Sequence, residues 1–417
     1  MKILIKGTLL GENVVDILVD GNRFAKIGGK IDVPEIDEII DGAGTAILPP
    51  FYNAHTHAAM TLLRGYADDM ELFKWLNEYI WPFEDKLTAE DIFAGSRLAI
   101  LEMIKSGTVF FNDMYWETQE TIRAAESMGV RSAIGMVFTD VTPKERVESN
   151  LDFIKNFRRT ELTQITIAPH AIYTASEGLL RRCAELARER GLLLHTHLAE
   201  TQKEVADCVK AHGKSPTKYL DDIGFLGSDV VAAHCVCLDD NDVEILQRRG
   251  VTIAHNPAAN MKLGSGIFRA AACNKAGCKI ALGTDGPSSN NNLDMGEEMK
   301  FAALLAKVSG TPEDIPAQSV FRWATSAGAE AFGIDAGVIA EGKLADALLV
   351  DLSDTRFVPN HNLISNWVYS ADRHCIRDVI CNGKILMRNR VVAGEDEIVE
   401  AARNAPCLKK SAQRRSA

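Results

Sequence analysis

The chain has 417 residues, enough for one large α/β barrel with an accessory domain or for two to three average domains. Its hydrophobic content of 46% and charged content of 25% are ordinary for a globular protein. The net charge of −11 argues against nucleic acid or an anionic membrane as a partner. No apolar run approaches about 18 residues, so we expect no membrane span, and the start lacks the cleavage site of a signal peptide.

The first segments of the chain are β-rich, and so are the last. Residues 17–29 have apolar runs on either side of an Asp-Gly-Asn turn, which is typical of a hairpin. Residues 342–352 and 376–392 are strand-like too, with Asn382-Gly383 as a second hairpin turn. Chain termini commonly lie close together, so we expect one small β-sandwich domain built from residues 1–48 and 345–417.

The middle of the chain alternates between strand and helix patterns. The helical patterns at residues 90–107 and 176–191 both close on glycine. This alternation predicts the α/β class, with a (β/α)8 TIM-like barrel over residues 49–344. The eight predicted strands are the apolar stretch 46–51 before His55, then 108–113, 132–138, 165–170, 192–198, 230–235, 251–257 and 279–285.

Histidines gather where these strands end. Barrel enzymes place their chemistry at the C-terminal ends of the strands. Neighbours two apart in a strand point to the same side, so His55 and His57 can converge on one point. Imidazoles with one carboxylate suit zinc, with iron or another divalent metal as alternatives. Seven of the ten histidines, together with Asp285, take such positions: His55, His57, His170, His195, His197, His234 and His255.

The remaining assignments are less determined by spacing. His195 and His197 point to the same side of one strand, so spacing leaves both as candidate ligands. Asp285 can ligate a metal and take a proton from its water, whose pKa the metal lowers. Glu200 follows His197 by three residues and can serve as a general acid, although an acid in the first turn of a helix is equally common.

The nine cysteines are scattered and include no C-x-x-C pair. A chain of this size without an export signal rarely depends on a disulfide framework. We therefore expect free thiols and a cytoplasmic location.

Seven stretches together resemble the amidohydrolase superfamily, and specifically its methylthioadenosine/S-adenosylhomocysteine deaminase branch. The H-x-H, H-x-x-E and T-D-G set is specific for the superfamily, and "MTLLRG-x-ADD" with "W-P-x-E" points to the branch. The resemblance covers essentially the whole chain: residues 55–87, "APHAIYT", "HTHLAET", "AHCVCL", "HNPAANMKLGSGI", "LGTDGPSSNNNLDM" and "ATSAGAEAFG".

This resemblance implies roles for particular residues. It implies metal ligation by His55, His57, His197 and Asp285, which leaves His195 as a barrel-interior or supporting residue. Glu200 would pass a proton to the purine ring nitrogen, and His234 would hold the attacking water and the tetrahedral oxygen. The substrate contacts that it implies are Trp75 as an apolar wall, Glu84 on the ribose hydroxyls, His170 near the purine, Glu200, and Arg146 on the amino-acid end of S-adenosylhomocysteine.

The sequence also departs from the branch pattern. A second arginine for the amino-acid end cannot be placed, Cys237 stands where relatives often carry another residue, and Pro50 stands where many have glycine. The fourth strand lacks the lysine that bridges two metals in some relatives, so we expect one divalent metal per chain, zinc first and iron second.

We therefore expect hydrolytic deamination of the 6-amino group of adenosine, 5′-methylthioadenosine or S-adenosylhomocysteine by a metal-bound hydroxide. The alternative is attack on another amino- or chloro-substituted ring such as guanine, a pterin, cytosine or an s-triazine. A noncatalytic scaffold is disfavoured by the intact ligand set. The expected partner is a small-molecule nucleoside, and we also expect a homo-oligomer.

Overall fold

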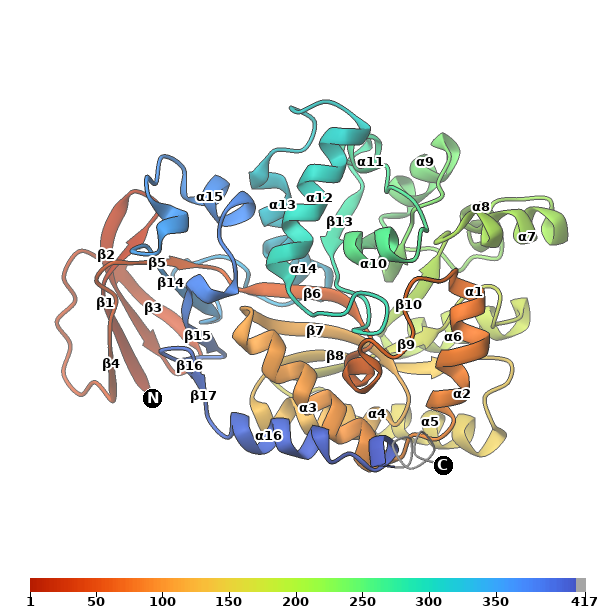
Figure 1. Ribbon diagram of the computed structural model, residues 1–417, viewed down its shortest axis with the longest axis horizontal. Helices are drawn as coiled ribbons and strands as arrows, with labels where there is room; N and C mark the ends of the chain where they lie inside the picture. Colours follow the sequence, from red (N-terminus) through yellow and green to blue (C-terminus); the bar gives the residue numbers. More distant parts are fainter. Residues whose placement is uncertain (410–417) are drawn as a thin grey trace.

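The computed structural model describes residues 1–409, so residues 410–417 of the predicted C-terminal stretch lie outside the described residues. Eight parallel strands form a nearly closed barrel and neighbour one another in chain order (Figure 1). The first and last strands meet where the backbone N–H of Asp285 donates to the carbonyl of His55 at 3.0 Å. The strands are β6 (Phe51–Thr56), β7 (Thr108–Tyr115), β8 (Arg131–Phe138), β9 (Thr163–Pro169), β10 (Leu193–Leu198), β11 (Val230–His234), β12 (Thr252–His255) and β13 (Lys279–Leu282).

Helices follow the barrel strands and pack outside them. The two helices that the sequence indicated are confirmed as α3 and α6, and α6 ends on Gly191 in the left-handed conformation. The helices between Ala89 and Ala331 are α3 (Ala89–Lys105), α4 (Thr118–Met128), α5 (Lys144–Asn156), α6 (Glu177–Arg190), α7 (Gln202–His212), α8 (Pro216–Asp222), α9 (Asp240–Arg249), α10 (Pro257–Lys262), α11 (Ala270–Ala276), α12 (Met295–Ser309), α13 (Ala317–Ala324) and α14 (Ser326–Ala331).

The loop after β6 is long and mostly helical. It contains the 3-10 turn η1 (Ala58–Leu63), then α1 (Leu72–Trp75), the π-helical η2 (Leu76–Ile80) and α2 (Trp81–Glu84). Isolated π turns often accompany functional sites because they redirect the side chains around them. These short helices therefore set the direction of the side chains between Leu72 and Glu84.

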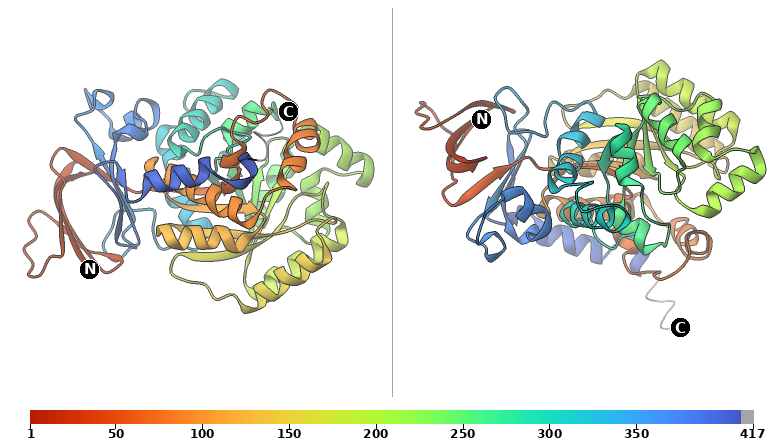
Figure 2. Two further views of the ribbon diagram at one scale, coloured as in Figure 1. Left: turned by 60° about the horizontal axis from the view of Figure 1, so that its bottom comes forward. Right: turned by 90° about the horizontal axis from the view of Figure 1, so that it is seen from above.

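Both ends of the chain contribute to a second sheet, as expected, and this sheet stands at one end of the barrel (Figure 2). The path of hydrogen-bonded strands runs β17-β16-β15-β14-β5-β1-β2-β3, with β4 paired to β1. Both predicted hairpins are present, between β2 and β3 and between β15 and β16. The strands are β1 (Lys2–Leu10), β2 (Asn13–Asp20), β3 (Arg23–Gly28), β4 (Glu38–Asp41), β5 (Thr45–Leu48), β14 (Ala347–Asp351), β15 (Ile376–Cys381), β16 (Lys384–Arg388) and β17 (Val391–Val392).

The apolar stretch before His55 is two strands, where the sequence suggested one. β5 ends at Leu48 and belongs to the second sheet, and β6 begins at Phe51 in the barrel. Pro49 and Pro50 separate them because proline has no N–H to give to a ladder. The chain thus passes from one sheet to the other over two residues, a few positions before the histidine pair.

The last described residues return to the barrel. The helical segments named after β14 are η3 (Thr355–Phe357), α15 (Leu363–Tyr369), η4 (Arg373–Cys375) and α16 (Glu395–Arg403). α16 lies along α3 (Figure 2), and Cys407 donates its backbone N–H to Asp91 of α3 at 2.9 Å. All nine cysteines are free, as expected. Among the helices of residues 1–409, none is long and apolar enough to cross a membrane.

Candidate active site

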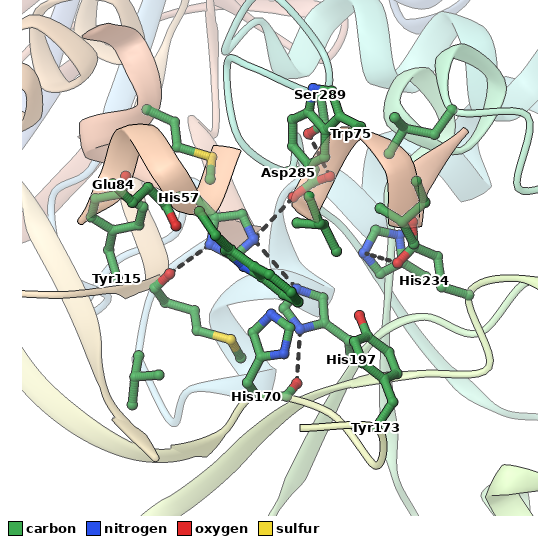
Figure 3. A pocket seen from close by; sticks show the side chains of 18 of the residues that line it. His57, Trp75, Glu84, Tyr115, His170, Tyr173, His197, His234, Asp285 and Ser289 are labelled. Carbon is green, nitrogen blue, oxygen red and sulfur yellow. Dashed lines mark hydrogen bonds and ion pairs between the residues drawn. The ribbon is translucent and has the colours of Figure 1, made fainter. Parts of the chain in front are cut away.

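The four predicted metal ligands meet at the C-terminal end of the barrel. One carboxylate oxygen of Asp285, Oδ1, lies 3.3 Å from Nε2 of His55 and 3.2 Å from Nε2 of His57. Nε2 of His197 lies 3.3 Å from Nε2 of His57. Figure 3 shows the rings of His57 and His197 and the carboxylate of Asp285 turned toward one another. Residues from β6, β10 and the loop after β13 therefore share one point.

The other ring nitrogens of these histidines are held by the protein. Nδ1 of His57 lies 2.5 Å from the carbonyl oxygen of Met114, and Nδ1 of His197 lies 2.8 Å from the carbonyl oxygen of His170. Nδ1 of His55 contacts Nε2 of His195 at 2.9 Å. Such contacts fix the tautomer and leave Nε2 free to ligate, as is usual for histidines that bind metals.

The donors fit a divalent metal ion. Nε2 of His55 is fully buried, and apart from the Asp285 oxygen at 3.3 Å it has no partner with hydrogen-bond geometry among the described residues, which is costly unless another group binds it. The nitrogens of His55 and His57 and an oxygen of Asp285 lie within 4.8 Å of one another, as do nitrogens of His55, His197 and His234. Imidazole nitrogens with one carboxylate oxygen are the donors that zinc and similar ions prefer.

Asp285 is further fixed by Ser289, whose hydroxyl donates to Oδ2 at 2.6 Å. This leaves Oδ1 as the oxygen that faces the histidines. Asp285 itself has φ 59, a left-handed conformation that is uncommon for a residue with a side chain and that often marks functional sites. Strand β13 ends at Leu282, and the tight loop after it brings the carboxylate of Asp285 to the histidines.

Glu200 and His234 lie beside the ligands in the same cavity. The carboxylate of Glu200 has its Oε2 3.8 Å from Nε2 of His234, and both side chains are buried. Burial raises the pKa of Glu200, which favours the protonated acid, while His234 acts in the opposite direction. Nδ1 of His234 lies 2.8 Å from Oδ1 of Asn260, so its Nε2 is the nitrogen that faces the cavity.

Trp75, Glu84 and His170 line this cavity as well. The indole N–H of Trp75 donates to the carbonyl oxygen of Ala67 at 3.0 Å, which presents the apolar ring faces to the cavity. Burial raises the pKa of Glu84 to about 7, although a nearby Tyr115 hydroxyl lowers it. Oε1 of Glu84 is shielded from solvent and has no hydrogen-bond partner among the described residues. A ligand with hydroxyl donors would satisfy it.

Arg146 does not line the metal cavity. It lines an adjoining cavity that shares Trp81, Glu84, Trp116 and His170 with the first. Its guanidinium donates to Oε1 of Glu117 at 2.9 Å and lies 5.4 Å from the centre of the Trp116 ring, so its charge is already paired.

Sequence reasoning missed several residues of the site. Ser289 lies inside a quoted motif, four residues after Asp285, and that spacing was a usable signal. Tyr115 is the last residue of β7 and Trp116 follows it, and this position at a strand end was another signal. Asn260 lies in α10 inside another quoted motif, and Glu117 follows Trp116 directly, but no spacing in the sequence indicated that they contact His234 and Arg146.

Comparison with known proteins gives consistent results. The pattern of the amidohydrolase family matches residues 46–386. The chain is 47% identical over 395 residues to a 5-methylthioadenosine/S-adenosylhomocysteine deaminase of Archaeoglobus fulgidus, covering 93% of each protein. It is 43% identical over 412 residues to a 5′-deoxyadenosine deaminase of Methanosphaera stadtmanae, covering 96% of this chain and 97% of that one. A zinc-bound adenosine deaminase structure from Xanthomonas campestris superposes with a TM-score of 0.91 at 32% identity, covering 96% of both chains.

Proposed function

Because the chain belongs to the amidohydrolase family, we propose that it is a metal-dependent deaminase which replaces the 6-amino group of an adenosine-type nucleoside by oxygen and releases ammonia. Relatives named for deamination of such nucleosides match nearly its full length. One observation carries the proposal. Metal-type donors, a buried acid and an unsatisfied carboxylate of the kind a ribose needs all line a single cavity.

The metal ligands in this proposal are His55, His57, His197 and Asp285. Their three imidazoles and one carboxylate support a single zinc ion, and a zinc-bound relative adds to that support. Iron is the second candidate, and metal analysis of the purified protein separates the two. When bound, the metal supplies a Lewis acid that makes water acidic enough to ionise near neutral pH.

The protein's own side chains then move the protons. Asp285, whose Oδ2 is held by the Ser289 hydroxyl, accepts the proton of the attacking water and delivers it to the leaving amine. Glu200, whose raised pKa favours the acid, protonates the purine ring nitrogen. His234, held through Nδ1 by Asn260, contacts the oxygen of the tetrahedral centre through Nε2.

The substrate contacts extend outward from the metal. Glu84 would accept hydrogen bonds from the two ribose hydroxyls, Trp75 would cover an apolar face of the nucleoside, and His170 would contact the purine. The adjoining cavity beyond Glu84 would take the 5′ substituent. Because Glu117 already pairs with Arg146, this cavity suits an uncharged substituent better than a free carboxylate.

A substrate screen tests the function directly. Purified protein, loaded with metal, is incubated with adenosine, 5′-deoxyadenosine, 5′-methylthioadenosine, S-adenosylhomocysteine, guanine and cytosine, and ammonia is measured. We expect the 5′-modified nucleosides to be the best substrates. Faster turnover of guanine or cytosine than of every nucleoside would establish the alternative ring-hydrolase function instead.

The cytoplasmic location and the homo-oligomer expected from the sequence stay predictions. Light scattering behind size-exclusion chromatography measures the second.

A further inference from the structure

The backbone at Glu200 is held by a second acid. Ala199 has the left-handed φ of 50, and the chain turns sharply there after β10. Glu204, in the first turn of α7, accepts the backbone N–H of Ala199 at 2.9 Å and that of Glu200 at 2.8 Å. Both amides are fixed because they donate to one carboxylate, so the start of the Glu200 side chain is held in place.

The carboxylate of Glu200 is held at its other end by Ser265. The hydroxyl of Ser265 donates to Oε1 of Glu200 at 3.3 Å, and Ser265 is only 6% exposed. The backbone of Ser265 is itself fixed, because its N–H donates to the carbonyl oxygen of Asn260 at 2.9 Å. Ser265 also lies between two glycines with positive φ, Gly264 and Gly266, which shape the loop that brings it there.

Cys237 ties these two segments together. Its thiol lies 3.6 Å from the carbonyl oxygen of Glu200 and 3.8 Å from that of Ser265, and its backbone N–H donates to Ala199 at 2.8 Å. The loops after β10, β11 and β12 therefore meet around Glu200. A group held from three loops has little freedom to leave the reacting geometry.

The contact also distinguishes the two oxygens of the carboxylate. Oε1 receives the hydroxyl of Ser265, whereas Oε2 faces Nε2 of His234 at 3.8 Å on the cavity side. An oxygen that already accepts a donated proton is the poorer place for the acidic proton of the carboxyl group. The acidic proton therefore belongs on Oε2.

We propose that Ser265 is a positioning residue of the deamination reaction, which acts through Glu200 by holding Oε1 and so keeping the transferable proton on Oε2 toward the substrate. This inference rests on the proposed role of Glu200 as the proton donor. Ser265 is not among the residues that line the cavity, so we expect its effect to fall on kcat and to leave KM nearly unchanged.

The experiment compares four single variants with the wild type at equal metal loading. Ser265→Ala removes the hydroxyl that donates to Glu200. Ser265→Cys keeps the size of the side chain with a weaker donor, and Ser265→Thr keeps the hydroxyl. Ser96→Ala is the matched control, because Ser96 is also buried and hydrogen-bonded but contacts Thr121 far from the site. We expect Ser265→Ala to lower kcat on 5′-methylthioadenosine roughly 3- to 10-fold, as the loss of one hydrogen bond to a neutral carboxyl group implies. Ser265→Cys should fall between Ala and the wild type.

A double variant shows whether the effect passes through Glu200. In the Glu200→Gln background, Ser265→Ala should cost less than about 2-fold, because the group on which it acts is gone. A full additional loss in that background, a loss no larger than that of Ser96→Ala, or a change confined to KM would overturn the inference. Failure of the wild type to deaminate any nucleoside would instead contradict the proposed function, and metal content, measured in every sample, separates either result from loss of the ion.

Discussion

The inner and outer parts of the cavity are built differently. Of the proposed metal ligands, His55 and His197 stand on barrel strands and His57 follows directly after β6, and each of the three has its second ring nitrogen held by the protein. Glu84 ends the short helix α2 and has an unpaired buried oxygen, and Arg146 lies at the start of α5, where its guanidinium pairs with Glu117 at the surface. The inner part is complete before a substrate arrives, and the outer part is completed by the substrate. Changes to the inner part should therefore affect all substrates, and changes to the outer part should affect some more than others.

Loss of an inner ligand should have the largest effect. His197→Ala removes one of four donors, so we expect loss of the tightly bound metal and of turnover on every substrate. Elemental analysis and ammonia release measure the two effects. His195→Gln is the comparison, because His195 contacts His55 without facing the Asp285 oxygen. His195→Gln weakens the support of only one ligand, His55, and should lower the metal affinity by roughly 10- to 100-fold. The opposite ranking of these two variants would make His195 the ligand.

Glu200→Gln should leave the metal in place and lower kcat by about 10²–10⁴, the usual contribution of general acid–base catalysis. The loss should be equal for all nucleosides, since the acid serves the ring and not the 5′ end. Steady-state kinetics on adenosine and 5′-methylthioadenosine check both points. Near-normal turnover in this variant would remove Glu200 from the mechanism.

Glu84→Ala should separate the outer part from the inner part. Two charge-assisted hydrogen bonds to the ribose are worth roughly 10- to 100-fold in kcat/KM after desolvation costs. The wild type should already be slow on 2′-deoxyadenosine, and the variant should lose less on that substrate than on adenosine, because it has no second contact left to lose. Equal losses on both nucleosides would show that Glu84 does not bind the ribose.

The pH dependence should also differ between the two parts. The pKa of Glu84 is raised to about 7 by burial, so Glu84 takes up a proton as the pH falls through that value. A protonated carboxyl group is a poorer acceptor for the diol, so kcat/KM on ribonucleosides should fall below the pKa, by about 10-fold for each pH unit until the 10- to 100-fold contribution of Glu84 is lost. In Glu84→Gln this decrease of kcat/KM at low pH should be absent. If the same decrease persists in that variant, another group causes it.

The smallest effect is expected at Glu117. Glu117→Gln frees Arg146, so kcat/KM on S-adenosylhomocysteine should rise relative to 5′-methylthioadenosine by roughly 2- to 5-fold, the range for a surface ion pair. Asp85→Asn is the control, since Asp85 lines the same cavity and is exposed. A fall in the ratio would mean that Glu117 binds the ammonium group of the substrate.

The inner part of the site was largely predictable from the sequence, and the outer part was not. The side-chain period of a strand puts His55 and His57 on one side, and the carboxyl ends of parallel strands meet at one face. The strand period alone could not decide whether His195 or His197 is the metal ligand, and the resemblance to known deaminases was needed to choose His197. The structure is consistent with that choice, because His195 lies behind His55 and His197 lies beside His57.

Loop geometry explains what the sequence could not predict. Asp285 reaches the metal site only because its backbone adopts a left-handed turn beyond the end of β13, and Ser265 reaches Glu200 from a different loop. Neither position follows a regular period. The sequence shows that Pro49 and Pro50 interrupt the apolar stretch. Only the pairing of β5 with β14 shows that these prolines separate two sheets.

That pairing has a consequence for how the protein is made. β5 lies between β1 and β14, and Leu48 is matched with Leu348, so one edge of β5 has no partner until most of the polypeptide has been translated. One edge of β6 likewise has no partner until β13 and the loop after it have been translated. Unpaired strand edges join readily to those of other molecules. A ribosome that stalls before Ala347 therefore releases a chain with an open edge, which chaperones must cover, and fragments that end there should accumulate as aggregates.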